Sequence, residues 1–432
     1  MAPREMYPSA IPKYPTFRDD PFKSPTLWLR GKQVDDGAEG LWRVHDDLYD
    51  LSNWVKNHPG GSEWLTLTKG TDITEAFESH HLSLTAAHLL KHFHVRPATT
   101  PRNSPYTFHE DGFYLTLKRR VMEQLKRTPI GPTFSSTLII DVLCSSALFF
   151  AVVAAATSNY MTGALSGFLL ALTVIAAHNF FHQKDNFRMY YFDLSLMSSR
   201  DWRISHALSH HLYPNSLLDL ELSMFEPVFQ FLPDPSKQWW ARYGPMLYAP
   251  FIYSGMFISQ IILRLALIRK GYLDSLRKED AIPLIIPGLM LLFSGCSVSS
   301  ALCMWMWVIL VSSFFFGAIS LNGAHHHPEI FHDGDAPRVD RDWGLSQLDT
   351  VRDRSVMGKY LFLALTNFGH HSLHHMFPTM DHSRLPQLYP IFRQMCDEFG
   401  VHFPQRTVAE LYKGQFQQIA RIEPNHVPPG GR

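Results

Sequence analysis

The chain has 432 residues, and its 39 lysines and arginines balance its 39 aspartates and glutamates. A net charge of zero argues against a nucleic-acid-binding protein, which would carry a basic excess. Charged residues make up only 18% of the chain, below the usual quarter, which indicates extended apolar segments. The four cysteines form no CxxC pattern, so a zinc knuckle and a covalently attached c-type haem are excluded. Histidine is prominent, because 14 of the 24 histidines lie between His178 and His382.

Composition divides the chain into five parts. Residues 1–25 are rich in proline and charge, which predicts an irregular arm without a cleavable signal peptide. Residues 26–95 mix Trp, Leu and Val with charged residues, as expected for a small compact domain. Residues 96–106 are rich in Pro, Ser and Thr and predict a linker. Residues 107–415 hold the long uncharged segments and most histidines, which predicts a membrane domain, and residues 416–432 form a C-terminal tail.

A histidine-proline-glycine-glycine sequence that begins at His58 is the most specific motif of the first hundred residues. Together with Thr71–Phe77 and the pair His80-His81, it resembles the cytochrome b5 domain, which has an α+β fold. The resemblance implies a haem b with two neutral imidazoles as axial ligands, of which His58 matches the first. His81, four residues after Phe77, matches the second, and His80 is the alternative. A haem with both axial positions filled serves one-electron transfer.

Two long uncharged blocks predict the membrane-spanning helices. Val142–Ala177 has 36 residues and Ala281–Ala324 has 44, whereas a spanning helix needs about 20. Each block therefore predicts two helices joined by a tight turn, at 158–161 in the first block and at 295–299 in the second. A third uncharged stretch, Tyr243–Leu263, has 21 residues. We expect it to lie at the interface or to re-enter, because basic residues flank both of its ends.

The orientation follows from the basic residues. The segment 269–280 contains two lysines and two arginines, so the positive-inside rule places it in the cytosol. Two helical hairpins would then bring every histidine cluster to the cytosolic face. The sequence thus predicts a multi-pass membrane protein, with the endoplasmic reticulum as the expected membrane, and with its N-terminal domain in the cytosol.

Histidines recur in four clusters, which follow the ends of the two uncharged blocks along the chain. An i, i+4 pair lies on one face of a helix, so both rings can reach one ion, and we expect the triplets to lie on one helical side as well. Neutral imidazoles around a metal avoid the repulsion of packed charged histidines, which predicts a polynuclear metal site. The clusters are His178 and His182; His206, His210 and His211; His325, His326 and His327; and His371, His374 and His375.

The predicted metal is iron. Imidazole ligands suit iron, zinc, copper and nickel. A one-electron haem donor on the same chain indicates redox chemistry at the second metal site, which favours iron over zinc.

The order of the motifs HxxxH, HxxxHH and HxxHH resembles that of integral-membrane fatty acid desaturases and hydroxylases, over about residues 130–415. The sequences HHLYPNSLLDLEL and HHMFPTMDHSRLP, at the second and last motifs, fit as well. With its N-terminal domain, the chain resembles the desaturases fused to cytochrome b5. Front-end members begin the last motif with glutamine, whereas this chain has His371, so front-end regiochemistry is not implied. The expected fold is an α+β haem domain plus an all-α membrane domain of four spanning helices under a cytosolic helical cap.

The resemblance implies two non-haem irons held by nine imidazoles, with no catalytic residue beyond the metal ligands. In the family, one ligand follows the last span in an Asn-x-x-x-His element, which Asn322 and His326 match and which His325 misses by one residue. His327 and His332 are weaker alternatives. The ligand set is His178, His182, His206, His210, His211, His371, His374, His375 and either His325 or His326, with Asp185, Asp219, Glu221 and Asp381 as candidate hydrogen-bond partners of the rings.

The function implied by this resemblance is desaturation of a fatty acyl lipid in the membrane. Electrons would pass from an NADH-cytochrome b5 reductase through the haem to the two irons, where dioxygen is activated. An acyl or sphingoid lipid hydroxylase is one alternative, since the same site chemistry serves both reactions. A membrane-tethered b5 electron carrier with an inactive desaturase-like domain is the other.

Overall fold

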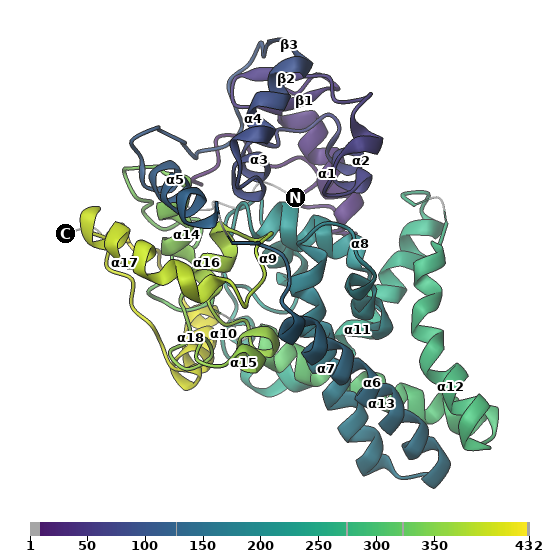
Figure 1. The fold of residues 1–432 in the computed structure, drawn as a ribbon. Helices are drawn as coiled ribbons and strands as arrows, with labels where there is room; N and C mark the ends of the chain where they lie inside the picture. The colour runs from purple at the N-terminus through teal and green to yellow at the C-terminus, as the bar shows by residue number, and fades with distance from the viewer. Residues whose placement is uncertain (1–8, 127, 274, 322–323, 430–432) are drawn as a thin grey trace.

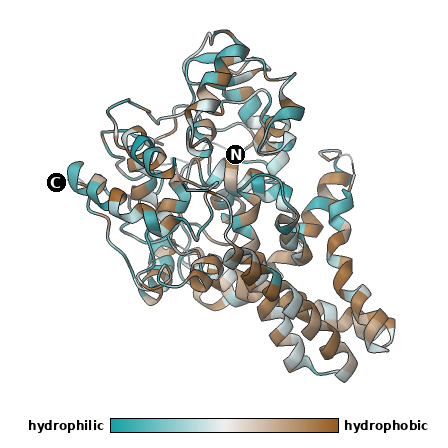
Figure 2. Ribbon diagram, in the orientation of Figure 1, coloured by the Kyte–Doolittle hydropathy of each residue, from teal (hydrophilic) through white to brown (hydrophobic). Residues whose placement is uncertain are grey.

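Figure 1 shows the two parts of the chain, which the computed structural model describes over residues 9–126, 128–273, 275–321 and 324–429. The N-terminal part lies at the top of this view, and long helices extend to the lower right. The C-terminal helices lie at the left. Hydrophobic residues dominate the long helices, whereas the N-terminal part and the C-terminal helices are largely hydrophilic (Figure 2). The arrangement agrees with the expected α+β domain followed by a mostly helical membrane domain.

The N-terminal domain is built on an antiparallel sheet in the order β1-β2-β3, of β1 (Trp42–Val44), β2 (Asp47–Tyr49) and β3 (His94–Pro97). Helical elements surround the sheet: α1 (Pro25–Asp35), η1 (Val55–Asn57), α2 (Ser62–Thr68), α3 (Thr74–His80), α4 (Leu84–Leu90) and η2 (Lys91–Phe93). The core consists of the buried side chains Trp42, Val44, Leu51, Leu65, Ile73 and Leu90. This core positions α2 and α3, beside which the two histidine motifs of the domain lie.

The first uncharged block folds as predicted. Its two helices are α6 (Phe134–Thr157) and α7 (Tyr160–Phe181), and both are long and apolar enough to cross a membrane. Ser158 adopts a left-handed conformation after α6, and the side chain of Asn159 accepts hydrogen bonds from the first backbone amides of α7. The turn therefore lies where the sequence predicts it, and it sends α7 back along α6 toward the histidines.

The second uncharged block differs from the prediction of two spanning helices. It contains the end of η5 (Lys278–Leu284), the 10-residue α12 (Ile285–Ser294) and the long α13 (Val298–Ser320). Only α13 is long enough to cross a membrane by itself. Only the 14 residues 281–294 of the block precede the turn at Gly295, which is too few for a spanning helix of about 20. Pro283, within η5, also removes a backbone donor from this segment. The predicted turn at Gly295 is present, with a left-handed backbone.

The third stretch forms α11 (Pro245–Arg269), which together with α6, α7 and α13 gives four helices of spanning length among the described residues. Length alone does not make α11 transmembrane, and its contacts favour the predicted interfacial position. The amide of Phe257, in the middle of α11, donates to the hydroxyl of Ser313, near the end of α13 that leads to the histidines. Both flanks of α11 also contact polar segments: Arg242 donates to the carbonyl of Ala420, and Arg30 donates to that of Tyr272.

Short helices form a cap over the end of the long helices that carries the histidines (Figure 1). They are α5 (Phe113–Leu125), η3 (Phe187–Ser195), α8 (Ser199–Trp202), the π-helical turn η4 (Arg203–His210), α9 (Leu220–Phe225), α10 (Trp239–Tyr243), α14 (Trp343–Thr350), α15 (Leu361–Thr366), α16 (His371–Met376), η6 (Leu385–Leu388), α17 (Tyr389–Glu398) and α18 (Val408–Ala420).

A buried polar network fixes the N-terminal domain to this cap. The fully buried carboxylate of Glu75, on α3, accepts hydrogen bonds from Tyr213, Ser104 and Arg102 at 2.9, 2.7 and 2.5 Å. Tyr213 follows the second histidine motif, and Arg102 belongs to the predicted linker. The indole of Trp28 also donates to the carbonyl of Leu218 at 2.8 Å. The linker is therefore tied into the interface between the two domains.

The contacts of α11 predict its topology. Accessibility tags inserted after Gly244 and after Gly271 should report the same side of the membrane, because the segment before α11 contacts the cap and the segment after it contacts α1 of the N-terminal domain. A tag at the turn 295–297 should report the opposite side. If the tags after Gly244 and Gly271 report opposite sides, α11 crosses the membrane and the interfacial position is wrong.

The network around Glu75 predicts that the two domains separate when it is broken. Glu75→Ala removes one of the two carboxylates that pair with the mostly buried guanidinium of Arg102, at a cost of about 3 kcal/mol. Trypsin should then cut after Arg102 more than tenfold faster, since cleavage follows the population of the opened state. Glu123→Ala, which removes an exposed ion pair with Lys126, is the control and should leave the rate unchanged. Equal rates for the two variants would contradict a fixed interface.

Candidate metal centre and haem site

Two histidines of the N-terminal domain face each other across a gap. His58 lies in the loop before α2, and His81 caps the end of α3. The Nδ1 atom of each ring binds a backbone carbonyl of its own segment, Gly61 at 2.8 Å for His58 and Phe77 at 2.9 Å for His81. Because a carbonyl only accepts, each Nδ1 carries the proton and each Nε2 keeps its lone pair for a ligand bond.

The gap fits one metal ion between the two rings. Their centres are 6.2 Å apart. Two metal–imidazole bonds of about 2 Å, with about 1 Å more from each nitrogen to its ring centre, also give roughly 6 Å. Burial lowers the pKa of His81 to about 4, which keeps this ring neutral as a ligand must be. His80 packs instead on Trp64, with ring centres 5.7 Å apart. The geometry therefore favours His81 over His80 opposite His58.

A first cluster of five histidines lies where α7, η4 and α16 meet. Their ligand nitrogens all lie within 4.8 Å of one another, and all five residues are buried. The Nε2 atom of His178 is 2.8 Å from that of His206, 3.0 Å from that of His182 and 3.1 Å from that of His374. Because several Nε2 atoms converge on one point, this arrangement is better explained by shared ligation of a metal ion than by hydrogen bonds between the rings. The cluster consists of His178, His182, His206, His211 and His374.

A second cluster lies beside the first. The ligand nitrogens of His210, His325 and His375 are within 4.8 Å of one another, and the Nε2 atoms of His325 and His371 are 2.7 Å apart. The rings of His211 and His375 stack at 4.0 Å, so the two clusters are in direct contact. The nine imidazoles therefore form two adjacent groups of five and four.

The second histidine motif supplies both clusters because it lies on a π-helical turn. The expectation that its three rings share one helical side is wrong. The amide of His211 donates to the carbonyl of His206 at 2.8 Å, which is an i to i+5 hydrogen bond. This wider turn aligns His206 with His211 in the first cluster and turns His210 toward His325 in the second. The sequence HxxxHH alone suggests α-helical spacing, which hides this division.

Burial keeps most of these rings neutral. Burial, together with the surrounding histidines, lowers the pKa of His206, His211, His371, His374 and His375 well below the usual range. His210 differs: burial opposes its charged form, but Asp219 and Glu221 outweigh burial and raise the pKa of His210 to about 9. Neutral imidazole is the form that binds a metal, so the donor set fits iron or another imidazole-binding ion.

Several rings have hydrogen-bond partners on the side away from the clusters. Of the four predicted acidic residues, Glu221 binds Nδ1 of His206 at 2.8 Å and Asp219 binds Nδ1 of His210 at 2.9 Å. The sequence reasoning missed two further partners: the side chain of Gln347 for His375 at 3.0 Å, and the carbonyl of Thr350 for His325 at 2.9 Å. Neither an amide nor a backbone carbonyl stands out in a sequence.

The other two predicted acidic residues do not bind a ring of either cluster among the described contacts. Asp185 accepts from Arg203 at 2.7 Å, and its amide donates to Gly60 beside the His58 loop. Asp381 accepts from Asn179 and Ser136, both at 2.7 Å, and so ties α7 and α6 to the segment after the last motif.

The structure separates the histidines after α13. His325 belongs to the second cluster, whereas the ring of His326 stacks on Phe231 at 3.5 Å and lies near His332. His327 packs against α18 at Gly414. Asn322, on which the expectation for His326 depended, lies outside the described residues. His382, which the sequence reasoning did not single out, packs on His374 with ring centres 4.5 Å apart and binds Asn179 at 2.8 Å.

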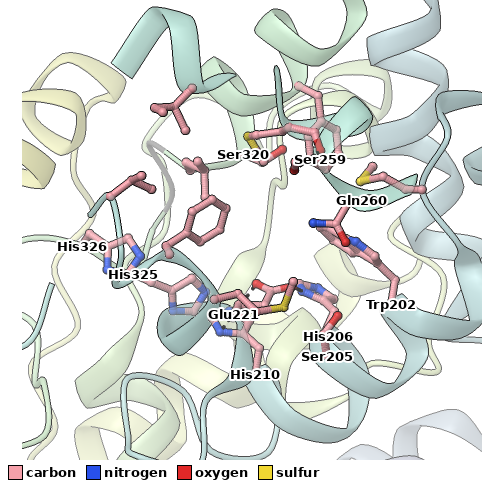
Figure 3. A pocket seen from close by; sticks show the side chains of 18 of the residues that line it. Trp202, Ser205, His206, His210, Glu221, Ser259, Gln260, Ser320, His325 and His326 are labelled. Carbon is pink, nitrogen blue, oxygen red and sulfur yellow. Dashed lines mark hydrogen bonds and ion pairs between the residues drawn. The ribbon is translucent and has the colours of Figure 1, made fainter. Parts of the chain in front are cut away.

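A largely apolar cavity of about 390 Å³ opens onto both clusters. His206, His210 and His325 line one side, and Figure 3 shows Ser259, Gln260 and Ser320 across the cavity from His210 and Glu221. The walls include apolar side chains of α11, α13 and the cap, namely Trp202, Met224, Phe225, Ile252, Met256, Phe316 and Phe368. The cavity can therefore bring a long apolar group to the histidines.

Comparisons with known proteins agree with both halves of this geometry. Residues 149–407 match the profile of the fatty acid desaturase family, and residues 31–98 match that of the cytochrome b5-like haem/steroid binding domain. A cytochrome b5-related protein of Drosophila melanogaster is 45% identical over 97% of this chain and 96% of its own length. More distant relatives include two proteins of Dictyostelium discoideum, each 24% identical: a probable Delta(5) fatty acid desaturase C, over 88% of this chain and 91% of its own length, and an acyl-lipid (8-3)-desaturase B, over 90% and 92%.

The N-terminal histidine pair, the nine converging imidazoles and these matches lead to one conclusion. The chain belongs to the fatty acid desaturase family and carries a cytochrome b5-like domain at its N-terminus.

Proposed function

We propose that this protein is a membrane-bound acyl-lipid desaturase, in which a haem in the b5-like domain feeds electrons to two non-haem irons. The observation that carries this proposal is the apolar cavity of about 390 Å³ that ends on two adjacent clusters of buried histidines. An electron carrier needs neither a cavity nor nine converging imidazoles. Distant relatives that are named as acyl-lipid desaturases support the same class of substrate.

The proposed ligands follow from the geometry. His58 and His81 are the proposed ligands of the haem iron. Of the two candidates after α13, we propose His325 rather than His326. The proposed non-haem iron ligands are His178, His182, His206, His211 and His374 in the first cluster, and His210, His325, His371 and His375 in the second.

The side chains around the cavity bind and orient the substrate. Met256 and Phe316 offer apolar surface to an acyl chain, and Trp202 stacks on His206 with ring centres 5.1 Å apart. These groups exclude water from the space beside the histidines. Bound irons supply dioxygen activation and the removal of two hydrogens from adjacent methylene groups, while the protein fixes which methylenes lie closest to them.

The electron supply and the location complete the proposal. We infer that an NADH-cytochrome b5 reductase delivers single electrons to the b5-like domain. This requires the domain, and with it the histidine face of the membrane part, to lie in the cytosol. The basic residues of the segment 269–280 support that orientation. The endoplasmic reticulum is the proposed membrane.

Two single substitutions test the proposal in cells that are profiled for lipids. His374→Ala removes a ring that contacts His178, so the non-haem iron content and the unsaturated product should fall more than tenfold while the low-spin haem spectrum stays intact. His58→Ala should remove the haem spectrum and leave the non-haem iron bound. His92→Ala, at an exposed position of the b5-like domain, is the control.

Each other outcome has a defined meaning. If His374→Ala loses iron but the wild-type protein changes no lipid under any acyl supply, the desaturase proposal fails and the electron carrier remains. A hydroxylated product that depends on His374 would replace desaturation by hydroxylation.

A further inference from the structure

His80 and His81 are adjacent in sequence, but their rings have different surroundings. His81 faces His58. The ring of His80 packs on Trp64, and its backbone carbonyl accepts from the hydroxyl of Thr379, just after the last histidine motif, at 3.3 Å. Trp64 belongs to the same apolar cluster as Ala207 of the second motif, so this edge of the b5-like domain shares a hydrophobic core with the segment that carries the second histidine motif.

The hydrogen bonds of His80 fix its protonation. Nδ1 lies 2.9 Å from the carbonyl of Ala76, which can only accept, so Nδ1 carries the proton. Nε2 is then a bare acceptor. It is buried, and among the described residues it has no hydrogen-bond partner. A buried acceptor without a donor is costly and therefore rare in folded proteins.

His182 presents the complementary donor. Its Nε2 atom points into the first cluster, 3.0 Å from that of His178, so a metal there takes the lone pair of Nε2 and leaves the proton on Nδ1. This Nδ1 is also buried without a partner in the described part of the chain. Trp64, on which the ring of His80 packs, also contacts the guanidinium of Arg203 at 4.7 Å, and Arg203 donates to the carbonyl of Phe181, the residue before His182. The rings of His80 and His182 therefore lie in the same region of the interface between the two domains.

We propose that His80 is a positioning residue for the metal centre, which accepts a hydrogen bond from Nδ1–H of His182, directly or through one water, when the metal is bound. This inference deepens the proposed function. It makes the b5-like domain supply the outer partner of a metal ligand, much as Glu221 does for His206 and Asp219 for His210. The same contact connects His80, which is next to the haem ligand His81 in sequence, to His182, a ligand of the first cluster.

The test is the affinity of the purified full-length protein for Fe(II), measured by competition with a chelator, together with the haem spectrum. Loss of an outer partner of a ligating histidine typically weakens metal binding by 10–100-fold. His80→Ala should therefore weaken Fe(II) binding about tenfold or more, yet keep the low-spin haem spectrum. His80→Gln places a carbonyl acceptor near the same point and should restore most of the affinity.

Controls keep the test independent of activity and of general instability. His88→Ala changes an exposed histidine of the same domain and should alter neither readout. After reduction of the haem, reoxidation under air should also be slower in His80→Ala than in His80→Gln, because the contact with His182 is missing.

Three results would overturn the inference. Unchanged Fe(II) affinity in His80→Ala excludes the hydrogen bond. Loss of the low-spin haem spectrum makes His80 an axial ligand instead. Equal loss of affinity in His80→Ala and His80→Gln assigns the effect to packing on Trp64. None of these results depends on a lipid product, so they remain distinct from a failure of the desaturase proposal.

Discussion

The structure depends on the burial of nine imidazoles in two touching groups. Each neutral ring has one donor and one acceptor nitrogen, and a buried nitrogen without a partner destabilises the fold by about 1–3 kcal/mol. The rings face one another with Nε2 atoms 2.7–3.1 Å apart at several contacts, where no protein donor can serve all of the lone pairs. Bound metal ions resolve this conflict, and we infer that the cap is most stable when the clusters are filled.

Local backbone features serve this convergence. The π-helical turn at 203–210 divides one motif between the two clusters. At α16, His370 adopts a left-handed conformation, and Asp353 accepts from the amide and the hydroxyl of Ser372 at 2.9 and 3.1 Å. Tyr389 donates to the same carboxylate at 2.6 Å. This network holds the first turn of α16 and thereby directs His371 and His374 to different clusters. Neither feature follows from helix propensity.

Much of the fold could be predicted from the sequence. Charge-free length predicts α6, α7 and the turn at Ser158, because each half of the first block belongs to a helix of spanning length. It fails for the first half of the second block, where only the 14 residues 281–294 precede the turn at Gly295. Histidine spacing predicts which motifs belong to a metal site. It does not predict how a π-turn distributes them, and it favoured His326, which stacks on Phe231. Partners such as Gln347 and the carbonyl of Thr350 come from distant segments, so only the tertiary structure reveals them.

The proposed function requires one chain to hold a haem and a separate pair of irons. The most direct measurement is the ratio of total iron to haem, with zinc determined in parallel, in full-length protein purified from iron-supplemented cells. We expect three irons for each haem, two of them non-haem, and little zinc. One iron for each haem, with the histidine clusters empty or filled by zinc, would contradict the proposed function.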